Sequence, residues 1–104
     1  MSFVFRLLRE DEVAGQAAVF EDSTNPGLVP LWEEIGVYDA LYNSDDRTAR
    51  EVSRTIAYGL DRMADNASLA RLLPATVSLN EAIRFLDNIH RACTIHPSAW
   101  IETR

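Results

Sequence analysis

Both histidines and the only cysteine of the chain lie together near its end, in the segment HRACTIHP that runs from His90 to Pro97. Imidazole and thiolate groups are used in many proteins to bind transition metals or to act as nucleophile and base. In a helix each residue turns by about 100°, so His90, Cys93 and His96 drift around the axis instead of projecting from one side. We therefore expect no metal site, no cofactor and no catalytic thiolate here, and we expect Cys93 to pack in the core.

The same segment contains an arginine followed five positions later by a histidine, Arg91 and His96. This R-x4-H spacing resembles the motif of the HEPN ribonuclease-like domains. The resemblance covers six residues and implies a small, all-helical and usually dimeric protein in which Arg91 and His96 form the RNA-cleaving pair. Ala92 departs from the pattern, because that family favours a polar residue there. A HEPN-like ribonuclease is the enzymatic alternative for this chain.

A second group of candidate residues lies on a helix expected from Asp45 to Asp65, where apolar residues recur at spacings of three and four. The polar side of this helix carries a row of large side chains, which are Arg47, Arg50, Arg54 and Tyr58. Arginine near a helix N-terminus opposes the macrodipole, so helix stability does not explain the row. Because arginine and tyrosine are enriched in binding hot spots, we expect the row to contact a partner, together with Trp32, which stands off the main stripe of its own helix. The alternative is that the arginines pair with Glu51, Asp61 or a neighbouring helix.

The segment that holds Arg91 and His96 has the clearest helix boundaries in the chain. Ser78-Leu79-Asn80-Glu81 is a capping box, and Pro97 disfavours helical geometry at His96, so this helix should run from Leu79 to about Ile95. The other expected helices run over Glu10–Glu21, Pro30–Asn43, Asp45–Asp65 and Ala67–Leu73.

The first eight residues are ambiguous between a strand and a helical turn, and a lone strand would have no partner in a helical chain. We therefore predict one all-α domain over residues 1–104, a compact bundle of four or five helices.

Composition limits the possible classes of protein. Of the 104 residues 47% are hydrophobic and 25% are charged, which is typical of globular proteins. The net charge of −6 and the absence of a strongly basic tract do not favour general binding to nucleic acid. The start, MSFVFRLLREDEV, lacks the pattern of a signal peptide, and no apolar run is long enough to span a membrane. The expected location is the cytoplasm.

Acidic clusters also point to a protein partner. Glu10, Asp11 and Glu12 stand together, as do Glu33 and Glu34, and such groups cap helices or steer a basic partner. An enzyme is not the favoured class. We expect a small acidic protein-binding module, an inhibitor or adaptor such as a bacterial toxin-immunity protein, whose partner is another protein, for example a toxin or an enzyme. The third alternative is an oligomer-forming structural subunit, possible as a homodimer, in which the arginine row meets a second copy.

Overall fold

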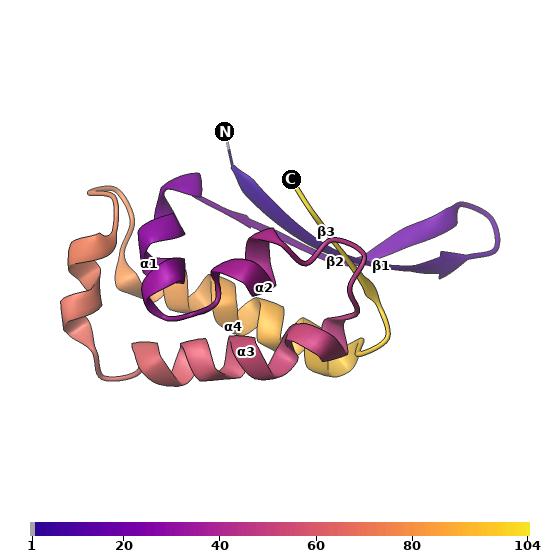
Figure 1. Cartoon of the computed structure of the whole chain (residues 1–104). Helices are drawn as coiled ribbons and strands as arrows, with labels where there is room; N and C mark the ends of the chain where they lie inside the picture. Colours follow the sequence, from indigo (N-terminus) through magenta and orange to yellow (C-terminus); the bar gives the residue numbers. More distant parts are fainter. Residues whose placement is uncertain (1) are drawn as a thin grey trace.

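A three-stranded antiparallel sheet forms one layer of the molecule, and the helices lie against one of its faces (Figure 1). The computed structural model describes residues 2–104. The all-α prediction and the helical bundle are wrong, because 23% of the chain is strand and 50% is helix. The strands are β1 (Phe3–Asp11), β2 (Gly15–Thr24) and β3 (Trp100–Thr103), in the order β2-β1-β3.

Four α-helices and two 3-10 helices make up the second layer. The α-helices are α1 (Val29–Glu34), α2 (Tyr38–Tyr42), α3 (Ala49–Met63) and α4 (Leu79–Ile95). The 3-10 helices are η1 (Pro26–Leu28) and η2 (Ala67–Leu72). None of the helices in residues 2–104 is long and apolar enough to cross a lipid bilayer.

A β-hairpin replaces the helix that was expected between Glu10 and Glu21. In its turn, the Asp11 carboxylate accepts hydrogen bonds from the backbone N–H groups of Val13 (2.8 Å) and Ala14 (3.0 Å). Gly15 follows with a φ of 79°, a conformation that glycine adopts without steric cost. The alanines and glutamates of this segment favour a helix, but pairing between β1 and β2 overrides that preference. The outer half of the hairpin projects beyond the helices (Figure 1).

The ambiguous first residues form the central strand of the sheet. Phe3, Phe5 and Leu7 are buried on the inner face, and the residues between them point to the outer face. The objection that a strand would lack a partner fails, because β2 and β3 pair with β1 on its two sides. Leu7 pairs with Ile101 of β3, and both side chains are buried.

Aromatic rings link the inner face of the sheet to the helices. The Phe3 ring stacks on Tyr42 of α2 with centroids 4.2 Å apart, and Trp32 of α1 lies 6.0 Å from Phe85 of α4. Trp32 is fully buried, so its expected role as a partner contact is corrected. The helix that carries it has only six residues and lies within the core, so the side chain off its main stripe also faces apolar neighbours.

Three of the other expected helices differ in the structure, and the one expected over Ala67–Leu73 is the 3-10 helix η2 (Ala67–Leu72). The one expected over Pro30–Asn43 is broken into α1 and α2, because Gly36 between them has a φ of 81°. The one expected from Asp45 begins only at Ala49. By contrast, the helix from Leu79 to Ile95 is confirmed, and the hydroxyl of its N-cap Ser78 accepts a 3.1 Å hydrogen bond from the Glu81 N–H.

The residues just before α3 pair with β3 instead of continuing the helix towards its N-terminus. The N–H of Asp46 donates to the carbonyl of Ile101 (3.0 Å), and the N–H of Ile101 donates to the carbonyl of Arg47 (2.9 Å). The backbone of Asp46 and Arg47 thereby covers the β3 edge of the sheet. At the opposite edge, β2 pairs with β1 alone among the strands that the structure describes.

Candidate functional site

The outer face of the sheet carries charged side chains, and no helix of residues 2–104 lies over it (Figure 1). At its centre Arg6 of β1 lies between two glutamates, with Nη1 2.6 Å from the Glu102 carboxylate on β3 and Nε 3.0 Å from the Glu21 carboxylate on β2. The contact of Nε with Glu21 is an ion pair without hydrogen-bond geometry. Because one guanidinium serves two carboxylates, this group keeps a net negative charge.

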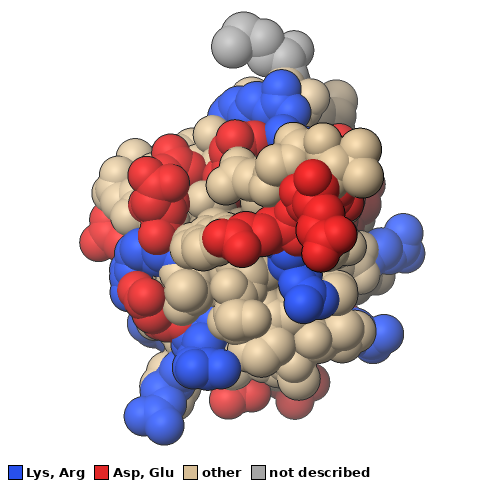
Figure 2. Space-filling model, turned by 90° about the vertical axis from the view of Figure 1, so that its right-hand side faces the viewer, with Lys and Arg blue, Asp and Glu red and all other residues tan. Residues whose placement is uncertain are grey.

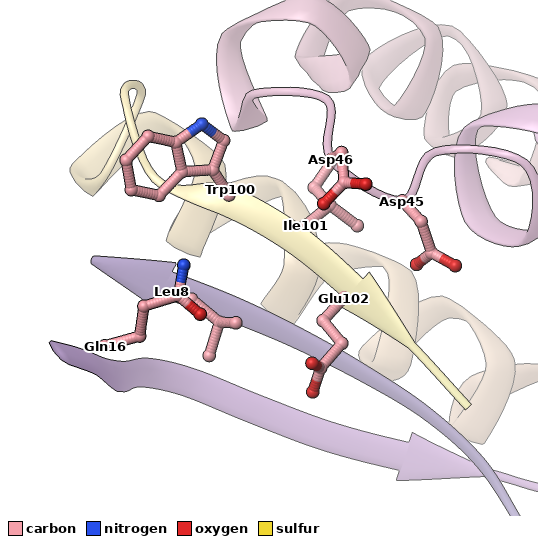
Figure 3. A pocket seen from close by; sticks show the side chains of 7 residues that line it. All are labelled: Leu8, Gln16, Asp45, Asp46, Trp100, Ile101 and Glu102. Atoms are coloured by element: carbon pink, nitrogen blue, oxygen red, sulfur yellow. The ribbon is translucent and has the colours of Figure 1, made fainter. Parts of the chain in front are cut away.

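Beside this group lies an open hollow of about 380 Å³, with Trp100 at the start of β3 at one end of it (Figure 3). Leu8, Gln16 and Glu102 reach it from the three strands, and Asp45 and Asp46 from the segment that covers the edge. Leu8 is only 8% exposed although no helix lies over it. Leu8 and the half-buried Trp100 therefore form a small apolar patch beside the carboxylates of Asp45, Asp46 and Glu102.

The two aspartates of this hollow have different roles. The Asp45 carboxylate accepts hydrogen bonds from the backbone N–H (2.8 Å) and the hydroxyl (3.0 Å) of Thr103, and so fastens the end of β3. Asp46 has a φ of 67°, which aspartate tolerates better than most residues, and its side chain is exposed. In residues 2–104 no hydrogen bond or ion pair occupies the Asp46 carboxylate, which leaves it available for a partner.

Neighbouring hollows share residues with this one and extend the surface along the hairpin. Trp100 also lines a hollow with Arg9 and Glu10, and Gln16 lines another with the acidic residues of the hairpin end. We call the combined surface the acidic face. It consists of Leu8, Gln16 and Trp100 with Arg9 and the carboxylates of Glu10, Asp11, Glu12, Asp45, Asp46 and Glu102.

This side of the molecule carries both acidic and basic side chains, and the acidic ones gather across its upper half (Figure 2). Figure 2 views the molecule from the end where the hairpin projects, and acidic side chains cross the upper half of that side while basic ones lie mostly below and around it. The N–H groups of Ala14 and Val13 lower the pKa of Asp11, so that its carboxyl stays ionised to lower pH than an ordinary aspartate.

The arginine row expected on the helix from Asp45 is only partly brought together. Arg50, Arg54 and Tyr58 are exposed on successive turns of α3, and Tyr58 is 63% exposed. Arg47 instead precedes the helix, and its Nε lies 3.1 Å from the Glu51 carboxylate, a contact that lowers the pKa of Glu51. Its expected place in the row on the helix is therefore corrected, whereas contact of Arg50, Arg54 and Tyr58 with a partner stays a prediction.

In the HRACTIHP segment the structure confirms the core position of Cys93. The thiol is 1% exposed, and its burial raises its pKa to about 12, so almost none of it is thiolate at neutral pH. Within residues 2–104 no group of three or more side chains is placed to hold a metal ion.

Arg91 and His96 line one hollow together with Val19, Phe20 and Ile95. The Arg91 Nε is already paired with Asp87 at 2.9 Å, and His96 is half-buried. The sheet also differs from the all-helical architecture that the HEPN resemblance implies. The two residues therefore share a surface, but that surface is mainly apolar and its arginine is engaged.

Sequence reasoning did not assign the central residues of the acidic face. No binding role was predicted for Trp100, and Asp46 falls within the helix expected from Asp45 to Asp65, which begins only at Ala49. The signal that could have located Trp100 is the alternation in Trp100-Ile101-Glu102-Thr103, where one apolar residue between two outward-facing ones is typical of a strand with one buried face.

Comparison of the chain with models of protein families, with curated proteins and with solved structures finds no match.

Proposed function

We propose that this protein is a small protein-binding module that uses its acidic face to contact a basic protein. The observation that carries the proposal is that Trp100 and Leu8 share one open hollow with Asp45, Asp46 and Glu102, on a sheet face that no helix of residues 2–104 covers. A large aromatic side chain supplies contact area at the centre of an interface, while surrounding charges act mainly on specificity and on the rate of association.

The charge of the acidic face supports a basic partner. Six carboxylates lie around Leu8, Gln16 and Trp100, and the basic groups among them are Arg9 and the Arg6 that pairs with Glu102. A surface of one dominant sign raises the local concentration of an oppositely charged partner, and this effect weakens as ionic strength rises. Binding should therefore be fast at low salt and slower at high salt.

The hollows themselves favour a macromolecule over a small ligand. Pockets for small molecules bury most of the ligand in a largely apolar cavity, whereas the hollows of the acidic face are open and mostly lined by polar groups. The projecting hairpin adds an exposed Val13 at its tip, which is 97% exposed and could enter a recess of the partner. Such a shape suits a protein that occludes a site on another protein.

Within this proposal, an inhibitor or adaptor is the favoured type, such as an immunity protein that blocks a bacterial toxin. An acidic surface with an apolar centre would compete for the basic surface that a nucleic-acid-cleaving toxin needs for its substrate. We place the protein in the cytoplasm, where a reduced Cys93 is compatible with the redox conditions.

Affinity capture from the native cell tests the proposal with three forms of the chain: the wild type, Trp100→Ala and the double variant Arg54→Ala/Tyr58→Ala. The double variant serves as the matched control, because it truncates a large exposed pair on α3 and leaves the acidic face intact. We expect a basic protein to be captured by the wild type and by the double variant, and to bind Trp100→Ala at least about tenfold more weakly.

Melting temperatures of the three forms distinguish lost contact from lost folding. A partner that is lost with the double variant and retained by Trp100→Ala would move the binding site to α3. Failure of the wild type to capture any basic protein would contradict the proposal itself.

A further inference from the structure

The edge of β2 that faces away from β1 has no strand beside it in residues 2–104. β2 is ten residues long, so this edge presents a row of backbone N–H and C=O groups that a further strand could pair with. The other edge of the sheet is already covered, because the backbone of Asp46 and Arg47 pairs with Ile101. The chain therefore protects one edge and leaves the longer one open.

The open edge of β2 lacks most of the features that prevent an edge strand from pairing with a strand of another chain. Gln16 to Phe20 are five consecutive residues without a charge or a proline. A bulge at Val19 interrupts the pairing with β1, since Leu7 lies opposite Phe20 and Leu8 lies opposite Ala18. Val19, the extra residue at the bulge, is 36% exposed and lines the hollow beside α4. The centre of the open edge is thus apolar.

An apolar groove runs beside this edge, between β2 and the end of α4. Val19 and Phe20 form its sheet side, and Ala92 and Ile95 its helix side, in a hollow of about 260 Å³. Ile95 is 70% exposed, which is unusual for an isoleucine so close to a core. A strand added to β2 would place its inward side chains over this groove and remove Ile95 from water.

We infer that the occupant of this edge is a second copy of the chain, whose β2 pairs antiparallel with the first around a twofold axis near Ala18 and Val19. The two sheets then join into one sheet of six strands, with the helices of both copies on the same face. The residues that meet at the axis are identical in the two copies, as a twofold interface requires.

The charges along β2 favour this arrangement over others. With the axis between Ala18 and Val19, Glu21 lies opposite Gln16 and Asp22 opposite Gly15 of the second copy. Moving the axis by half a residue in either direction still keeps every carboxylate of β2 away from another carboxylate. A parallel pairing in register would instead bring the two Glu21 side chains together, and like charges opposite one another destabilise a sheet.

The inner side of the new pairing is apolar as well. Phe20 of one copy comes beside Ala17 of the other, and both residues are half-buried and point towards the helices. Ile95 and Val19 of each copy then face the same axis. Apart from Gln16, the residues of the acidic face lie away from the open edge of β2, so this inference does not depend on the proposed partner and extends the function to a two-site module.

Net charge makes the dimer weak and salt-dependent. Each copy carries a net charge of −6, so repulsion between copies opposes pairing at low ionic strength. Added salt screens this repulsion, so the dimer should tighten as ionic strength rises. The salt dependence is opposite in sign to that expected for the basic partner on the acidic face, and this difference separates the two interactions.

Sedimentation equilibrium tests the inference on the wild type, on Ile95→Arg and on Val13→Arg, over protein concentrations from about 10 µM to 1 mM. Both variants add one arginine at an exposed apolar residue, and only Ile95 lies beside the open edge. We expect the wild type and Val13→Arg to approach the dimer mass, and Ile95→Arg to raise the dissociation constant at least about tenfold. Val19→Arg serves as a second disrupting variant, and circular dichroism checks the fold of each.

Oxidative cross-linking then tests the direction of pairing, using Ala18→Cys and Gln16→Cys, which are both exposed on the outer side of β2. The native Cys93 is buried and does not interfere. We expect Ala18→Cys to form a covalent dimer at least about tenfold faster than Gln16→Cys, because only residue 18 lies near the axis. Equal rates would contradict the antiparallel pairing. A wild type that stays monomeric at about 1 mM, or a dimer that is indifferent to both Ile95→Arg and Val19→Arg, would overturn the inference.

Discussion

The two faces of the sheet are made by alternate residues of the same strands, yet one face is apolar and buried and the other is charged and exposed. On the inner face Phe5 and Leu7 are completely buried beneath the helices. On the outer face Arg6, between them in the sequence, pairs with carboxylates from both neighbouring strands and remains in contact with water. The stability of this fold is therefore concentrated on one face of the sheet, which leaves the other free to present charge.

The difference in stability between the two faces follows from the free energies of apolar burial and of surface ion pairs. Full burial of a large apolar side chain contributes about 1.5–3 kcal/mol, whereas an ion pair near the surface contributes about 0–1 kcal/mol. Substitutions on the inner face should therefore change the free energy of unfolding strongly, and substitutions on the outer face should change it little.

The largest effect is expected for Phe5→Ala, which removes a fully buried ring from the inner face. The lost burial and the cavity that remains should lower the free energy of unfolding by about 3–5 kcal/mol. Urea unfolding measures this change. A loss of less than about 1 kcal/mol would mean that the inner face is not the source of stability.

A smaller loss is expected for Gly59→Ala on α3. A Cβ at this position would overlap Cγ1 of the buried Val37 and would lie 3.4 Å from Ile35 and from Leu86. Alanine favours a helix by about 1 kcal/mol over glycine, but overpacking against a β-branched side chain should cost more, for a net loss of about 1–2 kcal/mol in thermal unfolding.

Gly15→Ala at the hairpin turn provides the comparison for Gly59→Ala, because no atom lies within 4 Å of its added Cβ. It should cost only the penalty of a positive φ, about 1 kcal/mol. If Gly59→Ala instead unfolds at a higher temperature than the wild type, the side chains around Gly59 are loosely packed.

Replacement of Arg6 by methionine tests the outer face directly. Arg6→Met keeps much of the apolar stem and removes the guanidinium that serves Glu21 and Glu102. Because the Arg6 side chain is 24% exposed and the glutamates are more exposed still, we expect a loss of about 0.5–1 kcal/mol in urea unfolding. A loss as large as that of Phe5→Ala would remove the distinction between the faces.

The smallest effect is expected from protonation of Asp11 at the hairpin turn. Hydrogen bonds from Ala14 and Val13 lower its folded pKa, so the stability that it contributes is present above its unfolded pKa and is lost as the pH falls through the folded value. An NMR titration of the Asp11 carboxyl and the hairpin amides should show the shifted pKa. The same amides of Asp11→Ala should lose this acid transition, and their persistence in the variant would contradict the assignment.

The second half of the fold was largely readable from the sequence, and the first half was not. The helix from Leu79 to Ile95 is specified locally, by the Ser78 cap and by Pro97, and both act within a few residues. The central strand β1 pairs with β2 in a local hairpin and with β3 from the other end of the chain. Local propensity cannot register a pairing between residues nearly one hundred positions apart, so a strand at the start of the chain had no visible partner.

The candidate site was missed for the same reason. Asp46 and Trp100 meet only because the segment before α3 pairs with β3, and their sequence neighbourhoods give no sign of this. The acidic cluster at Glu10, Asp11 and Glu12 was visible in the sequence, and its charge alone led to the prediction, still untested, that it steers a basic partner. Its position at the end of a hairpin, beside the other carboxylates, required the sheet.

The most direct test of a binding role for the outer face compares two charge-matched double variants against the captured basic partner. Asp46→Asn/Glu10→Gln changes the acidic face, and Asp65→Asn/Glu33→Gln changes exposed acids elsewhere. Each pair removes one aspartate with a positive φ and one exposed glutamate, so the change in net charge and the backbone demands are the same. Calorimetric titration should give a dissociation constant at least about tenfold higher for the first pair and nearly unchanged for the second. Equal weakening by both pairs, or none by the first, would contradict a binding role for the acidic face.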